Sequence, residues 1–168
     1  ATGTRARKIT VPGADLPQVH ALRTAQDARV IRNALPVMKN VVIIGGGFIG
    51  LEAAAMLSAR GVQVDVVEMA PRLLGRATSE SVAEAIADHL IKTGVRLHLN
   101  QSVETIAAQD GAVCGVQLGE KFLAAGHVLV GVGAVPVDQL ATDAGLSTNN
   151  GVVVDTFLAT DDPDIFAI

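Results

Sequence analysis

The sequence has few aromatic side chains and little charge. It contains no tryptophan or tyrosine and only four phenylalanines, so few rings are available to stack on bases or sugars. Charged residues make up 18% of the chain, and 13 basic and 17 acidic residues mixed along it give a formal net charge of −4. Because this leaves no basic stripe to neutralise a phosphate backbone, the composition argues against a nucleic-acid partner.

Long apolar runs, paired cysteines and clustered histidines are also missing. Runs such as 41–44 and 128–135 are far shorter than the roughly 20 residues that cross a bilayer, and no signal peptide opens the chain. The single cysteine, Cys114, cannot form an internal disulfide, which fits a reducing compartment. We therefore expect a cytoplasmic protein without a membrane segment. The histidines lack metal-ligand spacing, so no metal site is expected at His20, His89, His98 or His127.

What is present is an alternation of strand and helix patterns. With 49% hydrophobic residues over 168 positions, the chain can form the core of one domain. Helical periodicity and capping residues predict helices over 24–35, 48–60 and 79–93. Apolar segments between turn residues predict strands over 41–44, 63–67, 95–99 and 128–132. This alternation predicts a parallel sheet.

The pattern changes after residue 99. Short alternating segments separated by glycine turns predict a small antiparallel meander over 103–107, 113–118 and 121–124. Beyond it, we expect a short helix over 137–144, a strand over 151–155, and a strand-like end at 165–168.

The first strand runs directly into a glycine loop and a helix. In this context each glycine has its own steric role. Gly45 allows the tight turn, Gly47 lets the backbone approach a pyrophosphate, and Gly50 lets the helix pack close to the sheet. The free N–H groups near Phe48 and Ile49, at the helix N-terminus, would attract the phosphates. The lysine of a P-loop is absent, which argues against nucleotide triphosphate hydrolysis.

An acidic residue follows at the end of the next strand. Glu68 lies eighteen positions after Gly50, where a carboxylate can accept hydrogen bonds from a ribose 2′-hydroxyl. A 2′-phosphate would face like-charge repulsion there, although Arg72 could partly offset it. The position therefore favours NAD over NADP. Taken alone, Glu68 would be interpreted first as an exposed carboxylate at a strand end.

The chain resembles the FAD-dependent pyridine nucleotide-disulfide oxidoreductases, the two-dinucleotide flavoproteins with the glutathione reductase fold. The resemblance rests on Ala-Thr-Gly at 1–3, the glycine loop at 45–52, the second glycine turn at 131–136 and the segment 164–168. Two further segments, 11–16 and 20–24, look most like oxygenase-coupled ferredoxin reductases of the putidaredoxin and rhodocoxin reductase type.

This resemblance implies a fold and a division into domains. The expected fold is α/β, a Rossmann-like parallel sheet with helices on both faces plus a three-stranded antiparallel meander. Residues 23–134 would be the NAD(H)-binding domain, 1–22 an FAD-domain remnant with the crossover, and 135–168 a further FAD-domain remnant. Because a second glycine loop and the family's terminal Gly-Asp are missing, we expect that the chain alone does not hold FAD tightly.

The resemblance also implies an activity and roles for further residues. NADH would pass a hydride to FAD, and single electrons would go on to a ferredoxin or rubredoxin of an oxygenase system. Glu52 would have an orienting, electrostatic role near the flavin and nicotinamide; otherwise it is a favourable charge near a helix N-terminus. Phe48 would be either a lid over the nicotinamide or a packing residue. The turn Gly131-Val132-Gly133 would approach the nicotinamide, although a plain domain crossing also explains its glycines.

Other functions remain open on the same scaffold. A disulfide reductase, an NADH oxidase or the large subunit of a nitrite reductase would differ mostly outside these residues. A non-catalytic nucleotide-sensing module, as in proteins similar to apoptosis-inducing factor, is the alternative from another class.

Overall fold

The fold of the chain comes from a computed structural model that describes residues 2–75 and 77–168. These residues form two compact units, which are described separately. The large unit is Lys8–Gly133, and the small unit combines the residues up to Arg7 with Ala134–Ile168. Within the described residues, no helix has both the length and the apolar character needed to cross a membrane.

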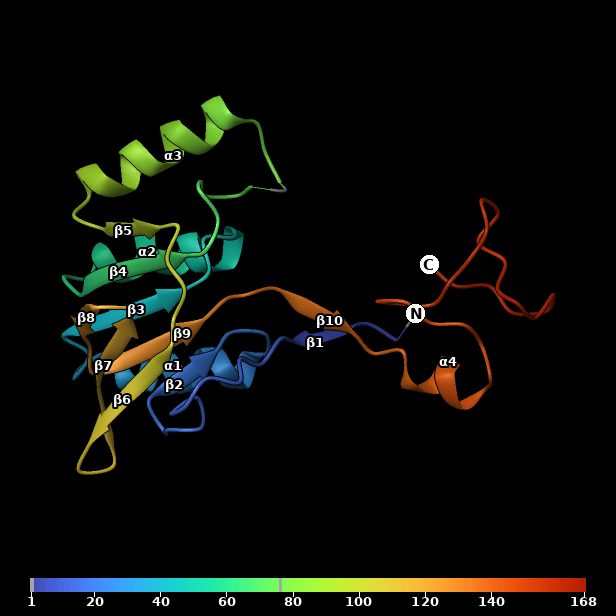
Figure 1. The fold of residues 1–168 in the computed structure, drawn as a ribbon, viewed down its shortest axis with the longest axis horizontal. Coiled ribbons are helices and arrows are strands. Elements are labelled where there is room, and N and C mark those ends of the chain that lie inside the picture. Colours follow the sequence, from blue (N-terminus) through green and yellow to red (C-terminus); the bar gives the residue numbers. More distant parts are fainter. Residues whose placement is uncertain (1, 76) are drawn as a thin grey trace. The chain divides into compact units, whose positions relative to one another are not determined.

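A five-stranded parallel sheet is the centre of the large unit (Figure 1). Its strands, in spatial order, are β2 (Val19–Ala21), β9 (His127–Val130), β3 (Asn40–Ile44), β4 (Gln63–Glu68) and β5 (Arg96–Leu99). The connecting helices are α1 (Ala25–Ala34), α2 (Phe48–Ser58) and α3 (Glu80–Lys92). The predicted helices and strands of this unit are therefore confirmed, with end points shifted by a few residues.

Local sequence signals explain where these helices begin and end. Thr24 caps α1 through a capping box, since its hydroxyl accepts from the Asp27 N–H at 3.2 Å while the Asp27 carboxylate accepts from the Thr24 N–H at 2.7 Å. Gly61 and Gly94 follow α2 and α3 with φ angles of 80° and 89°, the left-handed conformation that commonly terminates a helix.

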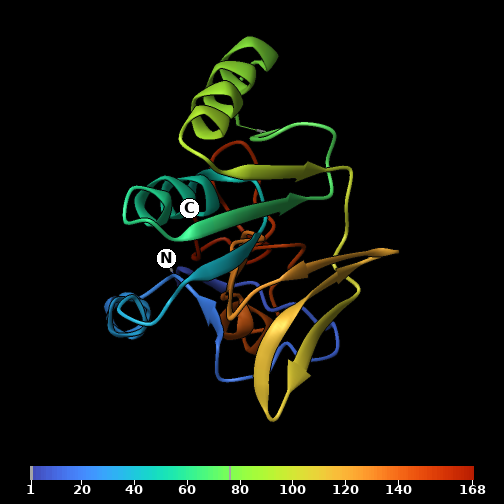
Figure 2. The same cartoon turned by 90° about the vertical axis from the view of Figure 1, so that its left-hand side faces the viewer.

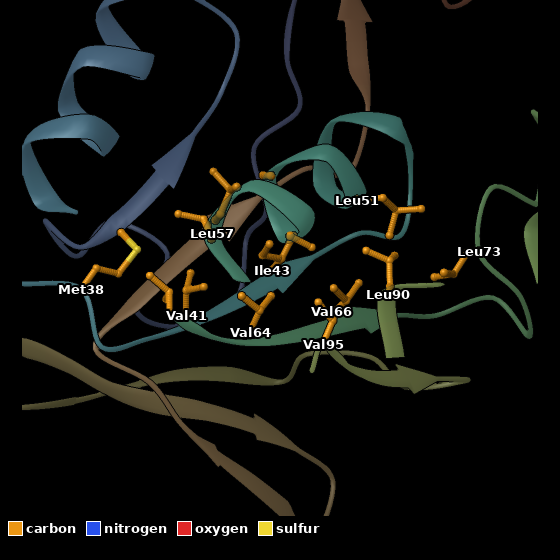
Figure 3. Packing of buried hydrophobic residues seen from close by; sticks show 14 of the residues in the cluster. Met38, Val41, Ile43, Leu51, Leu57, Val64, Val66, Leu73, Leu90 and Val95 are labelled. Atoms are coloured by element: carbon orange, nitrogen blue, oxygen red, sulfur yellow. The ribbon is translucent and has the colours of Figure 1, made fainter. Parts of the chain in front are cut away.

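The direction of the crossovers decides which face each layer covers. The connections β2–α1–β3, β3–α2–β4 and β4–α3–β5 all step the same way across the sheet, so right-handed crossovers place all three helices on one face. Side chains from these helices, such as Leu51, Leu57 and Leu90, pack there against Ile43 and Val66 (Figure 3). The return from β5 to β9 steps the opposite way and covers the other face. The predicted α/β fold is confirmed, with the correction that the second face is covered by the meander in place of the expected helices.

The meander forms the third layer (Figure 2). Strands β6 (Thr105–Gln109), β7 (Ala112–Leu118) and β8 (Lys121–Ala124) pair antiparallel, as predicted. Their inward side chains, Ile106, Val116 and Leu123 among them, pack on Val42 and Val128 of the sheet. Alternate residues of β3 thus point to opposite layers, which explains its continuous apolar sequence.

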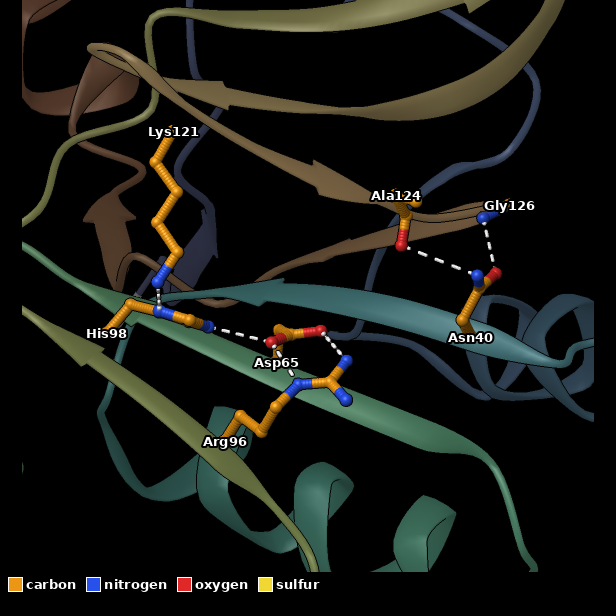
Figure 4. Close-up of polar contacts among 7 residues, drawn as sticks. All are labelled: Asn40, Asp65, Arg96, His98, Lys121, Ala124 and Gly126. Carbon is orange, nitrogen blue, oxygen red and sulfur yellow. Dashed lines mark hydrogen bonds and ion pairs between the residues drawn. The ribbon is translucent and has the colours of Figure 1, made fainter.

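A polar network joins the meander to the edge of the sheet (Figure 4). Asp65, on β4, is buried on the meander side and accepts two hydrogen bonds from Arg96, at 2.8 and 2.6 Å. His98 Nε2 lies 2.7 Å from the same carboxylate, and its Nδ1 lies 2.9 Å from Lys121 Nζ on β8. Burial alone would raise the pKa of Asp65, but the hydrogen bonds and charges of Arg96 and His98 bring that pKa below its ordinary value.

A second set of polar contacts lies where β9 begins. The Asn40 side chain accepts from the Gly126 N–H at 2.8 Å and donates to the Ala124 carbonyl at 3.4 Å (Figure 4). Close by in the sequence, His127 Nδ1 lies 3.1 Å from Nε2 of the buried His20 on β2. Burial lowers the pKa of both imidazoles, and the charge of His127 lowers the pKa of His20 further. The 107 positions between the two histidines hide this pair from sequence inspection.

The small unit holds β1 (Thr4–Ala6) paired antiparallel with β10 (Ala134–Pro136), and the short helix α4 (Gln139–Asp143). The expected strand at 151–155 was wrong, because its only pairing among the described residues is an isolated bridge from Val152 to Thr148. The strand-like end at 165–168 likewise makes a single bridge, from Phe166 to Ala159. An apolar segment extends as a strand only where a neighbouring strand continues beside it.

Candidate functional site

The glycine loop follows β3, and two of its glycines are required by the protein's own backbone. Gly45 has a φ of 107°, and a Cβ there would lie 2.5 Å from the carbonyl oxygen of Gly131. A Cβ on Gly50 would collide with the carbonyl oxygen of Gly45 and press on the Ile43 side chain. These positions therefore need glycine for the turn and the close packing of α2, as the sequence predicts.

Gly47 differs from both of these glycines. Its φ of −86° is open to any residue, and a Cβ would meet no atom within 4 Å. Gly47 is also the N-cap of α2, without a side-chain cap. Among the described residues, no acceptor faces the N–H groups of Gly47, Phe48 or Ile49. The loop thus combines free space with unpaired donors at a helix N-terminus, the usual features of an anion site.

Glu68 connects this loop to the turn after β4. One carboxylate oxygen accepts from the Gly46 N–H at 2.7 Å, and the other accepts from the Ala70 N–H at 2.8 Å. The side chain is half-buried. Each oxygen keeps a further lone pair, so the carboxylate can still accept hydrogen bonds from ribose hydroxyls.

Arg72 lies in the following segment and contacts the backbone of that segment. Its guanidinium donates to the carbonyls of Gly75, at 2.8 Å, and Thr78, at 3.1 Å. The structure therefore gives Arg72 a role in holding its own segment together.

The second glycine turn meets the first. The Gly131 N–H donates to the Ile44 carbonyl at 2.8 Å, and a Cβ on Gly131 would lie 3.5 Å from the Gly50 nitrogen, an ordinary contact. Val132 packs partly into the meander core, and Gly133 has a φ of 95°. The turn that was predicted to approach the nicotinamide thus lies against the loop that was predicted to hold the pyrophosphate.

Three predicted site residues of α2 face outward from the large unit. Phe48 is 57% exposed and Ile49 is 46% exposed, so neither belongs to the hydrophobic core. Glu52 is also exposed, in the second turn of the helix. Core packing therefore does not explain Phe48 within this unit, whereas surface packing and a lid over the nicotinamide both stay predictions.

Residues outside the fingerprint also shape the site. A Cβ on Gly46 would lie 2.7 Å from Leu73 Cδ2, and the Leu74 N–H donates to the Gly46 carbonyl at 3.0 Å. The sequence analysis did not predict these contacts of Leu73 and Leu74. Gly46, the middle glycine of the run, was the one feature of the sequence that pointed to a close approach there, whereas nothing in the sequence indicates the φ of 51° at Leu74. In the described part of the chain, no three histidine, cysteine or acidic side chains are grouped as a metal site would require.

Comparison with known proteins identifies the family of the chain. The family model for pyridine nucleotide-disulphide oxidoreductases matches residues 1–168. The chain belongs to this family. Within it, the chain is 42% identical to the rhodocoxin reductase of Rhodococcus erythropolis and 40% identical to the rubredoxin-NAD(+) reductase of Pseudomonas putida. All of this chain is covered in both cases, but only 40% and 44% of the relatives.

A solved structure of the same family has the same fold. The ferredoxin reductase for the CYP199A2 system from Rhodopseudomonas palustris is 44% identical, with a TM-score of 0.96 over the whole of this chain and 42% of that protein. The chain therefore spans about two fifths of the length of these three family members, all of which are oxidoreductases.

Proposed function

We propose that the large unit binds NADH, with the pyrophosphate at the glycine loop and the adenosine ribose at Glu68. Gly47 is the observation that carries this proposal. Internal packing explains why Gly45 and Gly50 are glycines, but nothing in the described protein occupies the space beside Gly47. A phosphate group approaching the N–H groups at the start of α2 would use that space.

The donors and acceptors suit an unphosphorylated dinucleotide. The unpaired N–H groups of the loop are matched to the charge of a pyrophosphate, and the Glu68 carboxylate is matched to ribose hydroxyls. A 2′-phosphate at Glu68 would place like charges together. We therefore propose NADH rather than NADPH as the ligand.

The further proposal is that this site serves a flavoprotein reductase. Bound NADH and FAD would supply hydride-transfer chemistry, with single electrons passed on afterwards. The turn from Gly131 to Gly133 has no side chain at either end to obstruct the nicotinamide, and Glu52 would orient it electrostatically from α2. The relatives named as rhodocoxin, rubredoxin and ferredoxin reductases support an iron–sulfur ferredoxin or a rubredoxin as the electron acceptor.

The two units suggest how the domains are divided. We assign the large unit to NAD(H) binding and the small unit to part of an FAD domain. The first boundary that we propose lies between Arg7 and Lys8, whereas the sequence suggested residue 22; the pairing of β2 within the parallel sheet supports the earlier boundary. The cytoplasmic location remains a proposal that rests on cysteine usage.

Titration calorimetry tests the cofactor proposal directly. The wild-type chain should bind NADH more tightly than NADPH. Glu68→Gln should weaken NADH binding by about 10- to 150-fold, the effect of losing one hydrogen bond to a charged group. Glu84→Gln removes an exposed carboxylate from α3 and should leave both affinities unchanged. Tighter binding of NADPH than of NADH by the wild type would overturn the assignment.

Electron transfer needs a separate measurement on a longer protein that includes a complete FAD domain, because this chain by itself is not expected to hold the flavin tightly. Adding NADH should bleach the flavin absorption, and a ferredoxin or rubredoxin should then restore it in single-electron steps. Bleaching that a disulfide substrate reverses, while the iron proteins do not, would favour a disulfide reductase instead.

A further inference from the structure

The segment from Glu68 to Leu74 contacts both the N–H and the carbonyl of Gly46 in the glycine loop. The spacing of the dinucleotide-binding motif does not predict these contacts. The Gly46 N–H donates to the Glu68 carboxylate at 2.7 Å, while the Gly46 carbonyl accepts from the Leu74 N–H at 3.0 Å. Leu73 packs its buried side chain against the same glycine. The residue between the two fingerprint glycines is therefore fixed by contacts from the ribose side of the site.

The contact from Leu74 has a geometric consequence for phosphate binding. The carbonyl of Gly46 and the N–H of Gly47 belong to one planar trans peptide group, so they point in opposite directions. Holding the Gly46 carbonyl on Leu74 consequently sets the direction of the Gly47 N–H. That N–H has no acceptor among the described residues and lies at the start of α2.

Leu74 reaches this position only in an unfavourable backbone conformation. Its φ is 51°, in the left-handed region that side-chain-bearing residues seldom adopt, although the side chain is buried. The surrounding turn is held by the Arg72 guanidinium, which donates to the carbonyls of Gly75 and Thr78, and by the Ala77 N–H, which donates to the Leu74 carbonyl at 2.8 Å.

We propose that Arg72 is a positioning residue that acts through Leu74: it holds the turn that aims the Gly47 N–H at the pyrophosphate. This inference rests on the proposed NADH site and deepens it. Arg72 then contributes to the binding of the pyrophosphate, which NADH and NADPH share. It does not distinguish the 2′-hydroxyl of NADH from the 2′-phosphate of NADPH. The segment from Glu68 to Leu74, on the ribose side, and the glycine loop, on the phosphate side, are consequently held together as one rigid part of the site.

The two possible roles of Arg72 predict different binding patterns. We would measure NADH and NADPH affinities by calorimetry for Arg72→Met, Arg72→Lys and the control Arg29→Met, which alters an exposed arginine of α1. Arg72→Met should weaken both ligands by the same factor, about tenfold. Arg72→Lys keeps a cation that can donate to one carbonyl and should recover most of the loss, while Arg29→Met should change neither affinity.

A measurement without ligand separates this inference from the cofactor proposal. In nitrogen-labelled protein, Arg72→Met should shift the amide resonance of Gly47, and Arg29→Met should not. In the wild type, the Leu74 amide should be protected from hydrogen exchange, and NADH should increase that protection. If Arg72→Met does not fold, Arg72→Lys and the wild-type exchange data carry the test.

The contrary outcomes are distinct. A loss for NADPH that exceeds the loss for NADH by more than about threefold would show that Arg72 contacts the 2′-phosphate. Unchanged affinities together with an unchanged Gly47 resonance would show that the turn does not aim this N–H, as would a Leu74 amide that exchanges freely. Failure of the wild type to bind NADH would overturn the cofactor proposal, while the resonance shift would still decide the role of Arg72.

Discussion

Adding a methyl group at Gly47 should weaken NADH binding while leaving the stability of the fold nearly unchanged. The backbone there has φ −86° and ψ 177°, which alanine adopts freely, and the new Cβ would meet no protein atom within 4 Å. Two effects on stability oppose one another. Alanine is a poorer N-cap than glycine, by roughly 0.5–1 kcal/mol, and it reduces the entropy of the unfolded chain, which contributes about 0.4–1 kcal/mol of stability.

Gly47→Ala should therefore change the free energy of unfolding by less than about 1 kcal/mol. Binding should respond far more strongly. If the methyl group keeps the pyrophosphate away from one N–H, the loss is that of a hydrogen bond to a charged group, about 1.5–3 kcal/mol, or roughly 10- to 150-fold in the NADH dissociation constant. Thermal unfolding and calorimetry on the same samples measure both quantities.

Gly47→Ser gives a second, sharper test. A serine hydroxyl at the N-cap can accept from the backbone N–H groups of the first turn of α2, so this variant should unfold at a higher temperature than Gly47→Ala. It should still bind NADH more weakly than the wild type, because the side chain occupies the phosphate space. Gly126→Ala is a matched control distant in sequence from the loop, where the Cβ would make an ordinary 3.5 Å contact with Asn40. An NADH affinity within about twofold of wild type in both Gly47 variants would refute the assignment of this space to a phosphate.

Three further predictions concern stability. Gly45→Ala should destabilise the fold by about 2–4 kcal/mol in denaturant titrations, because the alanine would have a φ of 107° and a Cβ only 2.5 Å from the Gly131 carbonyl oxygen; a loss below about 1 kcal/mol would contradict the observed packing. Asp65→Asn should cost about 1–3 kcal/mol, less than a fully buried ion pair because its arginine partner is 55% exposed. Since the pKa of Asp65 is lowered on folding, its contribution should be complete above about pH 4 and should disappear as the pH falls below that value; a variant that loses the same stability at about pH 2 and about pH 7 would count against the network. Because the pKa values of His20 and His127 are also lowered, protonation favours the unfolded state, so wild-type stability should fall as the pH drops below about 6.5. His20→Phe should reduce that fall in stability. A pH profile of the melting temperature that is the same in this variant and in the wild type would show that the histidine pair does not cause the fall.

Much of the large unit could be predicted because its signals are local. The apolar segment before Gly45, the helix after it and the glycines that end α2 and α3 act over a few residues, and each led to an element that the structure contains. The failures came from long-range conditions. The segment at 151–155 has a suitable composition but no neighbouring strand along its length, and the placement of the helices on one face depends on the order of strands in the sheet.

The sequence by itself determined the type and order of the elements in the large unit and the fingerprint of the site, since turns, caps and periodicity depend on neighbouring residues. Only the tertiary structure distinguished Gly47, which leaves space for a ligand, from Gly45 and Gly50, which the packing itself requires. It likewise showed that the Arg72 guanidinium donates to two carbonyls of its own segment, a contact that underlies the role we propose for it. These distinctions depend on which backbone atoms approach one another across the fold, and the spacing of residues in a motif does not predict such contacts.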